Sequence, residues 1–343
     1  MKAFLSAVLL FCFLSIDFIY AQPPSIDKVI FFRDTSILNA TISSNLGKLL
    51  RQKKTGAQFQ ATFTATLPNG TIVNDPVLLE IRGHFRKDYC YLPPLKIVFK
   101  GQNSSTLTPL GSLKLVSQCK TNGPYEQYLL KEFLVYKIYN LLTDMSFRVR
   151  MLNVNFFDSS GKKKTIAEHA FLMEDIKDLA KRNKCKDLKD VKLVSEATDR
   201  RQMTIVSIFE YMIGNLDWGV PVNHNTKLII SKNDSLNHAF VVPYDFDYSG
   251  LVNTEYAIPP EGFDIQNVQE RIYRGFPRTT REVNEVLDIF KHQKENIYAL
   301  INNFELLTPN SKKEMINYLD DFFDQINKPD KVKYIFVENA RNF

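Results

Sequence analysis

The chain lacks the sequence signatures of several common enzyme classes. It contains no Gly-x-x-x-x-Gly-Lys or Gly-x-Gly-x-x-Gly segment, which disfavours P-loop and dinucleotide-binding folds. It contains no Gly-x-Ser-x-Gly or His-Glu-x-x-His segment either, which weighs against the common hydrolases and the zincin metalloproteases. Internal repeats, low-complexity tracts and Gly/Ser/Pro-rich linkers are also missing. We therefore expect a single catalytic unit over residues 28–340.

Cysteine is scarce. The chain has four cysteines, and no Cys-x-x-Cys spacing supports a metal or redox site. Cys12 lies in an N-terminal segment that we expect to be removed. The other three allow one disulfide and one free thiol, with Cys90 and Cys119 as the nearer pair and Cys185 left over.

An excess of one charge is missing as well. The net charge is +6 over 343 residues, which is small for this length. The densest basic runs, residues 162–164 and 181–186, fit a solvated turn or helix face. Because no zinc spacing or aromatic-basic ladder accompanies them, nucleic acid is not an expected partner.

Long apolar runs are confined to the N-terminus. A charged start leads into an apolar run that Asp17 interrupts, and Ala21 offers a small residue for cleavage, as in secretory signal peptides. We predict a signal peptide over residues 1–21, a secreted, periplasmic or cell-surface location, and no stable membrane insertion. An uncleaved N-terminal anchor is the alternative. The Ala-Gln junction is typical of bacterial signals, so Asn-x-Ser/Thr tripeptides carry little weight.

Strand patterns dominate the front of the mature chain and helical patterns its end. Residues 59–67 alternate apolar and polar side chains, Pro68-Asn-Gly70 turns the chain, and a second strand returns it, which is typical of a hairpin. Other strands are expected at residues 95–99, 148–157, 165–173, 226–231 and 238–243. Helices are expected from Tyr125, over residues 174–189, around residues 205–213, and twice near the C-terminus. This order predicts an α+β fold with two lobes, strand-rich then helical, and a cleft between them.

The candidate catalytic groups lie within residues 214–250. Asp217 follows an apolar helix, Asn225 precedes a strand, and Asp245 and Asp247 follow the next strand. Kinase-type sites use this order: one acid orients or deprotonates the acceptor hydroxyl, while an amide and a second acid hold Mg²⁺. We predict Asp217 as the catalytic residue and Asn225, Asp245 and Asp247 as metal ligands, with Asp245 preferred over Asp247.

Each of these residues also has an ordinary structural explanation. A turn aspartate, a turn-capping asparagine and an Asx turn would account for Asp217, Asn225 and Asp245. His224 is assigned a structural role, because no partner spacing supports it. Function is favoured because two aspartates beside a buried strand repel each other unless a cation lies near them.

Candidate phosphate contacts lie earlier in the chain. Lys96 interrupts an apolar strand and could reach into a cleft, where Glu132 on the next helix would fix it by an ion pair. Arg82, beside Gly83, could clamp phosphate with two guanidinium nitrogens. A solvated strand face, a surface glutamate and a strand-end turn are the alternatives.

These segments, in this order and spacing, resemble the spore coat protein H (CotH) kinase family. The resemblance runs from Arg82-Gly83 through the strand with Lys96, the helix with Glu132 and the strand ending in Glu174, and then to the two acidic motifs. It departs from the family at His84, where the usual residue is asparagine.

The resemblance implies an atypical protein-kinase fold that binds ATP with Mg²⁺ and phosphorylates Ser/Thr residues of proteins. It assigns Asp217 as acid/base, Asp245 to the metal, Lys96 to the phosphates and Glu174 to the adenine-side strand. Two other functions remain open. The chain could be a catalytically inactive surface or assembly protein that keeps the fold, or a phosphotransferase acting on a sugar or other small molecule.

Overall fold

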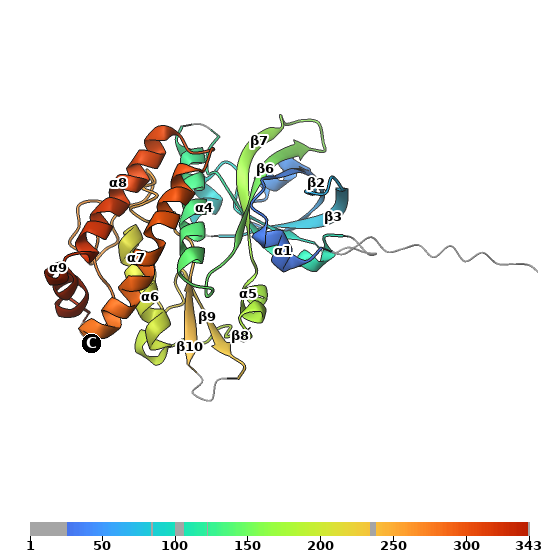
Figure 1. Ribbon diagram of the computed structural model, residues 1–343. Coiled ribbons are helices and arrows are strands. Elements are labelled where there is room, and N and C mark those ends of the chain that lie inside the picture. Colours follow the sequence, from blue (N-terminus) through green and yellow to red (C-terminus); the bar gives the residue numbers. More distant parts are fainter. Residues whose placement is uncertain (1–25, 84, 100–105, 122, 234–237, 342–343) are drawn as a thin grey trace, which may run out of the picture.

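The front of the described chain forms a closed β-barrel (Figure 1). The computed structural model describes residues 26–83, 85–99, 106–121, 123–233 and 238–341, so the predicted signal peptide and His84 lie outside the described residues. Around the barrel the strands follow the order β1-β2-β3-β4-β5-β7-β6. They are β1 (Leu38–Ser44), β2 (Gln58–Thr66), β3 (Ile72–Ile81), β4 (Leu95–Val98), β5 (Ser112–Ser117), β6 (Val149–Asp158) and β7 (Ile166–Met173).

Parallel pairing of β1 with β6 closes the barrel. Leu38 pairs with Leu152 and Ser44 with Asp158, whereas the other ladders of the barrel are antiparallel. Alternate side chains point inward, as the pleat requires. They form an apolar core that includes Ile42, Leu79, Ile97, Leu115, Leu152 and Leu172.

The closed barrel shows that the predicted two-lobed, kinase-like fold is wrong. The molecule is a mixed α/β fold in which a seven-stranded barrel carries helices on its outside. The alternation of apolar and polar residues fixes which side chains face inward, but it does not fix which strand edges pair. The decisive β1–β6 pairing joins segments more than a hundred residues apart, beyond the reach of a local pattern.

Short helices and one disulfide lie in the segments that precede or connect the strands of the barrel. They are α1 (Lys28–Arg33), α2 (Leu46–Arg51) and α3 (Phe85–Tyr89). Cys90, directly after α3, forms a disulfide with Cys119 just beyond β5, so the nearer pair of cysteines is the bonded one. Cys185 is a buried free thiol. The disulfide fixes α3 against the end of β5.

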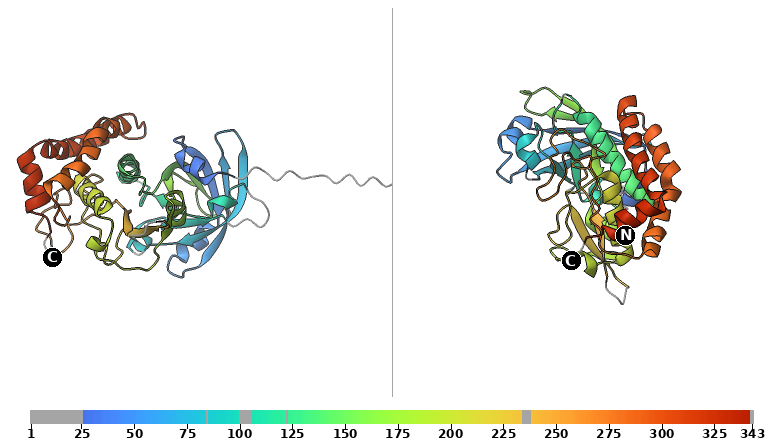
Figure 2. Two further views of the ribbon diagram at one scale, coloured as in Figure 1. Left: turned by 60° about the horizontal axis from the view of Figure 1, so that its bottom comes forward. Right: turned by 90° about the vertical axis from the view of Figure 1, so that its left-hand side faces the viewer.

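Helix α4 (Tyr125–Leu142) lies between the barrel and the C-terminal helices (Figures 1 and 2). Because it packs against β7 on one side and α7 on another, most of its residues are buried, including the polar Lys131 and Glu132. The other long helices are α6 (Arg200–Ile213), α7 (Thr280–Asn302) and α8 (Pro309–Ile326), followed by α9 (Pro329–Lys333). Short 3₁₀ turns lie at Thr108–Leu110 and Ser195–Ala197, and a π-helical turn at Tyr334–Glu338.

A second sheet lies beside α6, with strand order β10-β9-β8. It contains β8 (Cys185–Asp187), β9 (Thr226–Ser231) and β10 (Ala239–Pro243). The helix predicted over residues 174–189 is helical only in α5 (Ile176–Arg182), because Lys184 adopts a left-handed conformation with φ of 55° and the chain continues as β8. The predicted hairpin of β9 and β10 is confirmed.

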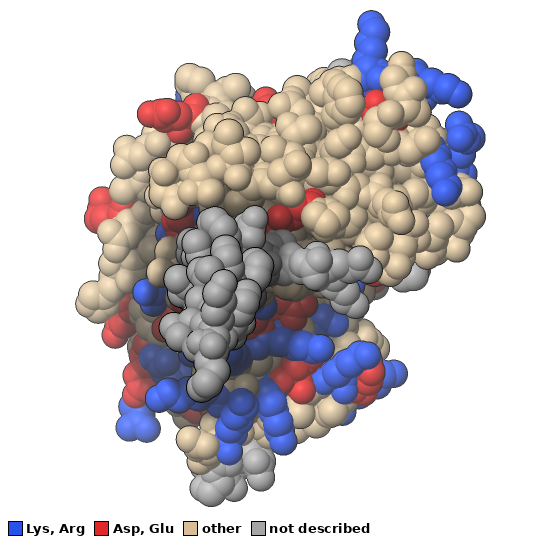
Figure 3. All heavy atoms as spheres, turned by 90° about the vertical axis from the view of Figure 1, so that its right-hand side faces the viewer, with Lys and Arg blue, Asp and Glu red and all other residues tan. Residues whose placement is uncertain are grey.

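Lysine and arginine side chains gather in the lower half of the face shown in Figure 3, at the level of α5 and β8–β10 in Figure 1, whereas the upper half is mostly neutral. Within the described ranges, no helix is both long and apolar enough to cross a membrane.

Candidate active site

Asp217 lies on a loop that begins where α6 ends. Gly214 closes the helix in the left-handed conformation, with φ of 65°, which glycine adopts without a steric penalty. The side-chain oxygen of Asn215 accepts a hydrogen bond from the Asp217 amide at 3.0 Å. Arg274 donates from Nη1 to the backbone carbonyls on both sides of Asp217, at 2.8 and 2.7 Å. The loop is therefore fixed by a hydrogen bond between its own residues and by two from Arg274.

The Asp217 carboxylate is held by two neighbours in the following loop. His224 Nε2 lies 2.7 Å from Asp217 Oδ1. Asn225 Nδ2 donates to Asp217 Oδ2 at 2.9 Å and to the Asp217 carbonyl at 2.8 Å. Asn225 reaches this position in a left-handed conformation with φ of 49°. The structure thus brings two predicted site residues into direct contact, and it gives His224 a partner that the sequence did not reveal.

Sheet register brings Asp245 to the same place. The antiparallel pairing of β9 and β10 sets Thr226 opposite Pro243, so Asn225 and the residues after β10 meet at one end of the hairpin. Asp245 also has a left-handed backbone, with φ of 68°, and its amide donates to the hydroxyl of Tyr136 on α4 at 2.8 Å. A cap of this kind holds the Asp245 turn in an otherwise uncommon conformation.

Asp247 lies deeper, among buried charged groups. Tyr256 donates its hydroxyl to Asp247 Oδ2 at 3.0 Å, and Arg86 Nη1 lies 3.8 Å from the same oxygen. Burial, together with the negative charge of Asp245, raises the pKa of Asp247 to about 6.

Glu132 faces this acidic pair rather than Lys96. Its pKa is raised well above the ordinary value by burial and by the carboxylates of Asp247 and Asp245. Among the described residues, Glu132 Oε1 has no hydrogen-bond partner. The predicted ion pair between Glu132 and Lys96 is therefore replaced by a buried cluster with Arg86 and Asp247.

Cations from the barrel and from α3 line the same cleft as the acids, and this cleft has a volume of about 640 Å³. Arg82 Nε donates to the carbonyl of Leu95 at 3.2 Å, and Arg86 Nη2 to that of Ser117 at 2.7 Å, so barrel strands hold both guanidinium groups. Lys114 on β5 lies over the ring of Tyr244, 4.2 Å from its centroid. Burial and the nearby charge of Arg82 lower the pKa of Lys114 to about 8.

The cleft has two walls of opposite charge. We call Asp217, Asn225, Asp245 and Asp247 the acidic wall, and Arg82, Arg86 and Lys114 the basic wall; all seven line the cleft. Of the predicted residues, the structure thus brings together the catalytic aspartate, the metal ligands and Arg82.

Lys96 is not among the residues that line the cleft. Its Nζ makes an ion pair with Glu80 Oε2 at 2.9 Å on a partly exposed face. The register of β4 and β5 sets Lys96 directly opposite Lys114, which does line the cleft. Both lysines interrupt apolar strands in the same way, as Leu-Lys-Ile and Leu-Lys-Leu. Alternation alone could not choose between them, and sequence analysis overlooked Lys114.

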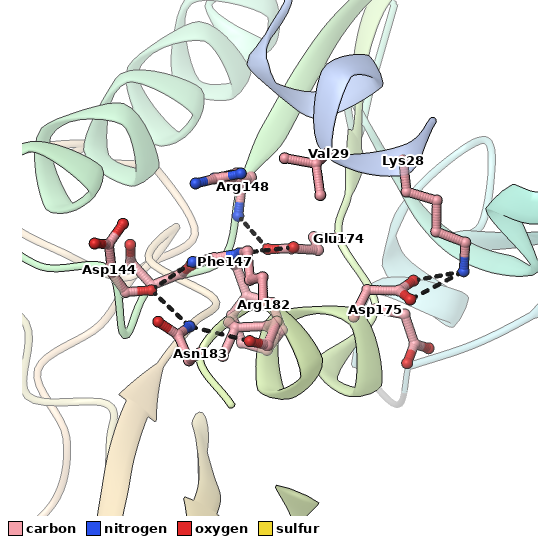
Figure 4. Close-up of polar contacts among 12 residues, drawn as sticks. Lys28, Val29, Asp144, Phe147, Arg148, Glu174, Asp175, Arg182 and Asn183 are labelled. Carbon is pink, nitrogen blue, oxygen red and sulfur yellow. Dashed lines mark hydrogen bonds and ion pairs between the residues drawn. The ribbon is translucent and has the colours of Figure 1, made fainter. Parts of the chain in front are cut away.

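Glu174 also lies away from the cleft lining (Figure 4). It follows β7, and both of its carboxylate oxygens accept hydrogen bonds from Arg182, at 2.9 and 3.1 Å. Glu174 Oε2 also accepts a hydrogen bond from the Arg148 amide at 3.1 Å. These bonds connect the end of β7 to α5 and to the start of β6. Glu174 therefore stabilises the fold at this point.

The acidic wall fits a Mg²⁺ ion that also takes phosphate oxygens. Mg²⁺ is usually held by one or two carboxylates together with substrate phosphates and water. Among the described residues, no three His, Cys, Asp or Glu side chains gather closely enough to hold a metal by themselves. The acidic wall offers Asp245, Asp247 and the amide oxygen of Asn225, and the buried Glu132 nearby keeps one carboxyl oxygen without a hydrogen-bond partner among the described residues.

No protein-family model matches this chain, and no curated protein sequence matches it. The resemblance to the CotH kinase family therefore rests on the motifs alone and stays a hypothesis.

Proposed function

We propose that this chain is an exported, Mg²⁺-dependent kinase that transfers the γ-phosphoryl group of ATP to Ser/Thr hydroxyls of a protein. The observation that carries the proposal is the set of charged groups that line one cleft: carboxylates and an amide in the acidic wall, two arginines and a lysine in the basic wall. Phosphoryl transfer depends on positioning and on neutralising phosphate charge, and it needs little covalent chemistry from the protein.

Each wall has a distinct task in this proposal. Asp217, oriented by His224 and Asn225, accepts the proton of the acceptor hydroxyl as its oxygen bonds to phosphorus. The bond between that phosphorus and the bridging oxygen breaks, and ADP leaves. Arg82 and Lys114 bind phosphate oxygens and balance their charge. Asp245 and Asp247, with the amide oxygen of Asn225, would hold Mg²⁺, which would neutralise phosphate charge.

The test is the thermal stability of the purified protein with ATP, with Mg²⁺, and with both. If the cleft binds Mg²⁺ and ATP together, only the combination stabilises the fold, by about 2.7 kcal/mol at a hundredfold excess over the Kd. Asp245→Asn should lose most of this gain. Asparagine is the right replacement because it tolerates the left-handed backbone at this position.

Asp190→Asn is the matched control. Asp190 is also an aspartate in the left-handed conformation, with φ of 61°, but it is exposed and does not line the cleft. It should keep the full gain. Equal responses of the two variants, or no response of the wild type, would overturn the proposed site.

Transfer is tested separately with Asp217→Asn and labelled ATP. We expect this variant to keep the stabilisation by Mg²⁺ and ATP but to lose transfer of label to protein by at least about a hundredfold, the scale of general-base catalysis. Wild-type protein that binds the nucleotide but transfers no label to any protein would refute the kinase and favour a non-catalytic binding protein.

A further inference from the structure

A second, smaller pocket adjoins the cleft at Asp217. It has a volume of about 140 Å³, and Asp217 and Tyr248 line both it and the cleft. Apart from these two residues and Glu261, its wall is apolar, formed by Gly214, Leu216, Ile258, Pro259, Pro260, Ile265 and Val268. We call it the apolar pocket.

The size and position of the apolar pocket suit one side chain of an acceptor. A cavity of about 150 Å³ with an apolar lining holds a benzene ring, so the pocket can take a leucine or phenylalanine side chain. Since Asp217 lines both spaces, a hydroxyl placed at Asp217 puts its neighbouring groups at the pocket mouth. A sugar or another polyol would bury less apolar surface there, because hydroxyl groups cover most of its carbon skeleton.

Close backbone packing connects residues of the pocket wall. Gly250 forms a hydrogen bond from its amide to the carbonyl of Gly214 at 3.0 Å, and a Cβ at Gly250 would crowd the backbone of residues 268 and 269. Gly214 lines the pocket, and Val268 and Ile265 form part of its wall. The Gly250 backbone therefore contacts both Gly214, at the start of the loop that carries Asp217, and the segment that contains Val268.

We infer that the apolar pocket selects acceptors with a large aliphatic or aromatic side chain within a few residues of the modified Ser or Thr. The inference rests on the proposed function, because it takes Asp217 as the point where the acceptor hydroxyl binds. It narrows the substrate class to peptide segments that carry an apolar residue near the hydroxyl.

The test is peptide binding without nucleotide, measured by fluorescence anisotropy. Each labelled peptide carries one serine in an Ala/Lys/Gly background, with a single leucine within about three residues of it, since an extended chain spans ~10 Å over that distance. A matched peptide has aspartate in place of the leucine. We expect the best leucine peptide to bind the wild type at least about tenfold tighter than its aspartate counterpart, the usual scale for filling an apolar pocket.

Ile258→Asp and Ile72→Asp form a matched pair of variants. Both isoleucines are exposed, at 68% and 71%, but only Ile258 lines the pocket. Ile258→Asp should abolish the preference for leucine, and Ile72→Asp should keep it. Ile265→Asp repeats the test from another pocket residue, with thermal melts to verify folding.

Equal peptide preferences of Ile258→Asp and Ile72→Asp, or no preference for leucine in the wild type, would overturn the inference. Because this binding is measured without ATP, its failure is separate from that of the kinase proposal. The kinase proposal fails instead when Mg²⁺ and ATP together give no stabilisation.

Discussion

The two walls of the cleft are built by different means. The acidic wall comes from one short stretch of chain, and turns with left-handed residues and side-chain hydrogen bonds hold it. The basic wall comes from separate strands and a short helix, and barrel carbonyls hold its two arginines. Local turns thus position the acids, whereas the register of a closed sheet positions the cations.

This difference decides which changes damage each wall. A wall made of turns is sensitive to backbone conformation, because left-handed positions tolerate few residues. A wall made of strand side chains is less sensitive to backbone conformation. Its charge depends instead on which strand residues line the cleft. The following predictions test this contrast, from the largest expected effect to the smallest.

Gly214→Ala should cause the largest loss. Gly214 has φ of 65°, and an added Cβ would overlap the hydroxyl of Tyr318. A left-handed alanine costs about 1–2 kcal/mol, and overpacking adds about 1–3 kcal/mol. We expect a total loss of about 4 kcal/mol in the free energy of unfolding, measured by urea denaturation, together with weaker stabilisation by Mg²⁺ and ATP.

Gly161→Ala separates the two costs. Gly161 has nearly the same conformation, with φ of 68°, but no atom lies within 4 Å of its added Cβ. It should lose only the conformational part, about 1–2 kcal/mol, and keep the response to Mg²⁺ and ATP. Equal losses in the two variants would show that Tyr318 does not constrain the acidic wall.

The same contrast explains what could be predicted from sequence. Asp217, Asn225 and Asp245 were found because their wall is local: a helix end, a loop and a hairpin are all visible in one stretch of sequence. Lys114 was overlooked and Lys96 preferred, because both lysines interrupt apolar strands in the same way and lie on the same face of the sheet, so that only the three-dimensional arrangement shows that Lys114 lines the cleft. The barrel itself was missed for the same reason, since its closure depends on the distant pairing of β1 with β6.

The raised pKa of Asp247, which lies 3.8 Å from Arg86 of the basic wall, predicts that the free energy of unfolding depends on pH. Its pKa is about 6 in the folded protein, against an ordinary value of 3.8. Between about pH 4 and 6 the folded protein therefore binds more protons than the unfolded chain, so the free energy of unfolding falls as the pH rises. The shift corresponds to about 3 kcal/mol. Asp247→Asn should remove the contribution of Asp247 to this decrease in the free energy of unfolding. Urea unfolding at several pH values between about 4 and 6 measures it.

Glu210→Gln is the comparison for this measurement. Glu210 is buried on α6, and burial raises its pKa to about 8. Its contribution to the decrease in the free energy of unfolding therefore continues above about pH 6. Mg²⁺ at the proposed site would require the ionised carboxylate of Asp247. Stabilisation by Mg²⁺ and ATP should therefore increase as Asp247 loses its proton, near pH 6, in the wild type and in Glu210→Gln. A wild-type stability that does not fall between pH 4 and 6 would contradict the raised pKa.

The finest comparison is between Lys114 of the basic wall and Lys96, its paired neighbour in the β4–β5 ladder. Lys114→Met should weaken the binding of ATP with Mg²⁺ about tenfold, or about 1.4 kcal/mol, because it removes a cation from the cleft. Lys96→Met removes only a partly exposed ion pair with Glu80, which contributes about 0–1 kcal/mol to stability, and should leave this affinity within about twofold. Titration of each variant with ATP, followed by thermal stability, measures both. The reverse order of effects would return the phosphate contact to Lys96, whose side chain lies on the same face of the sheet as that of Lys114.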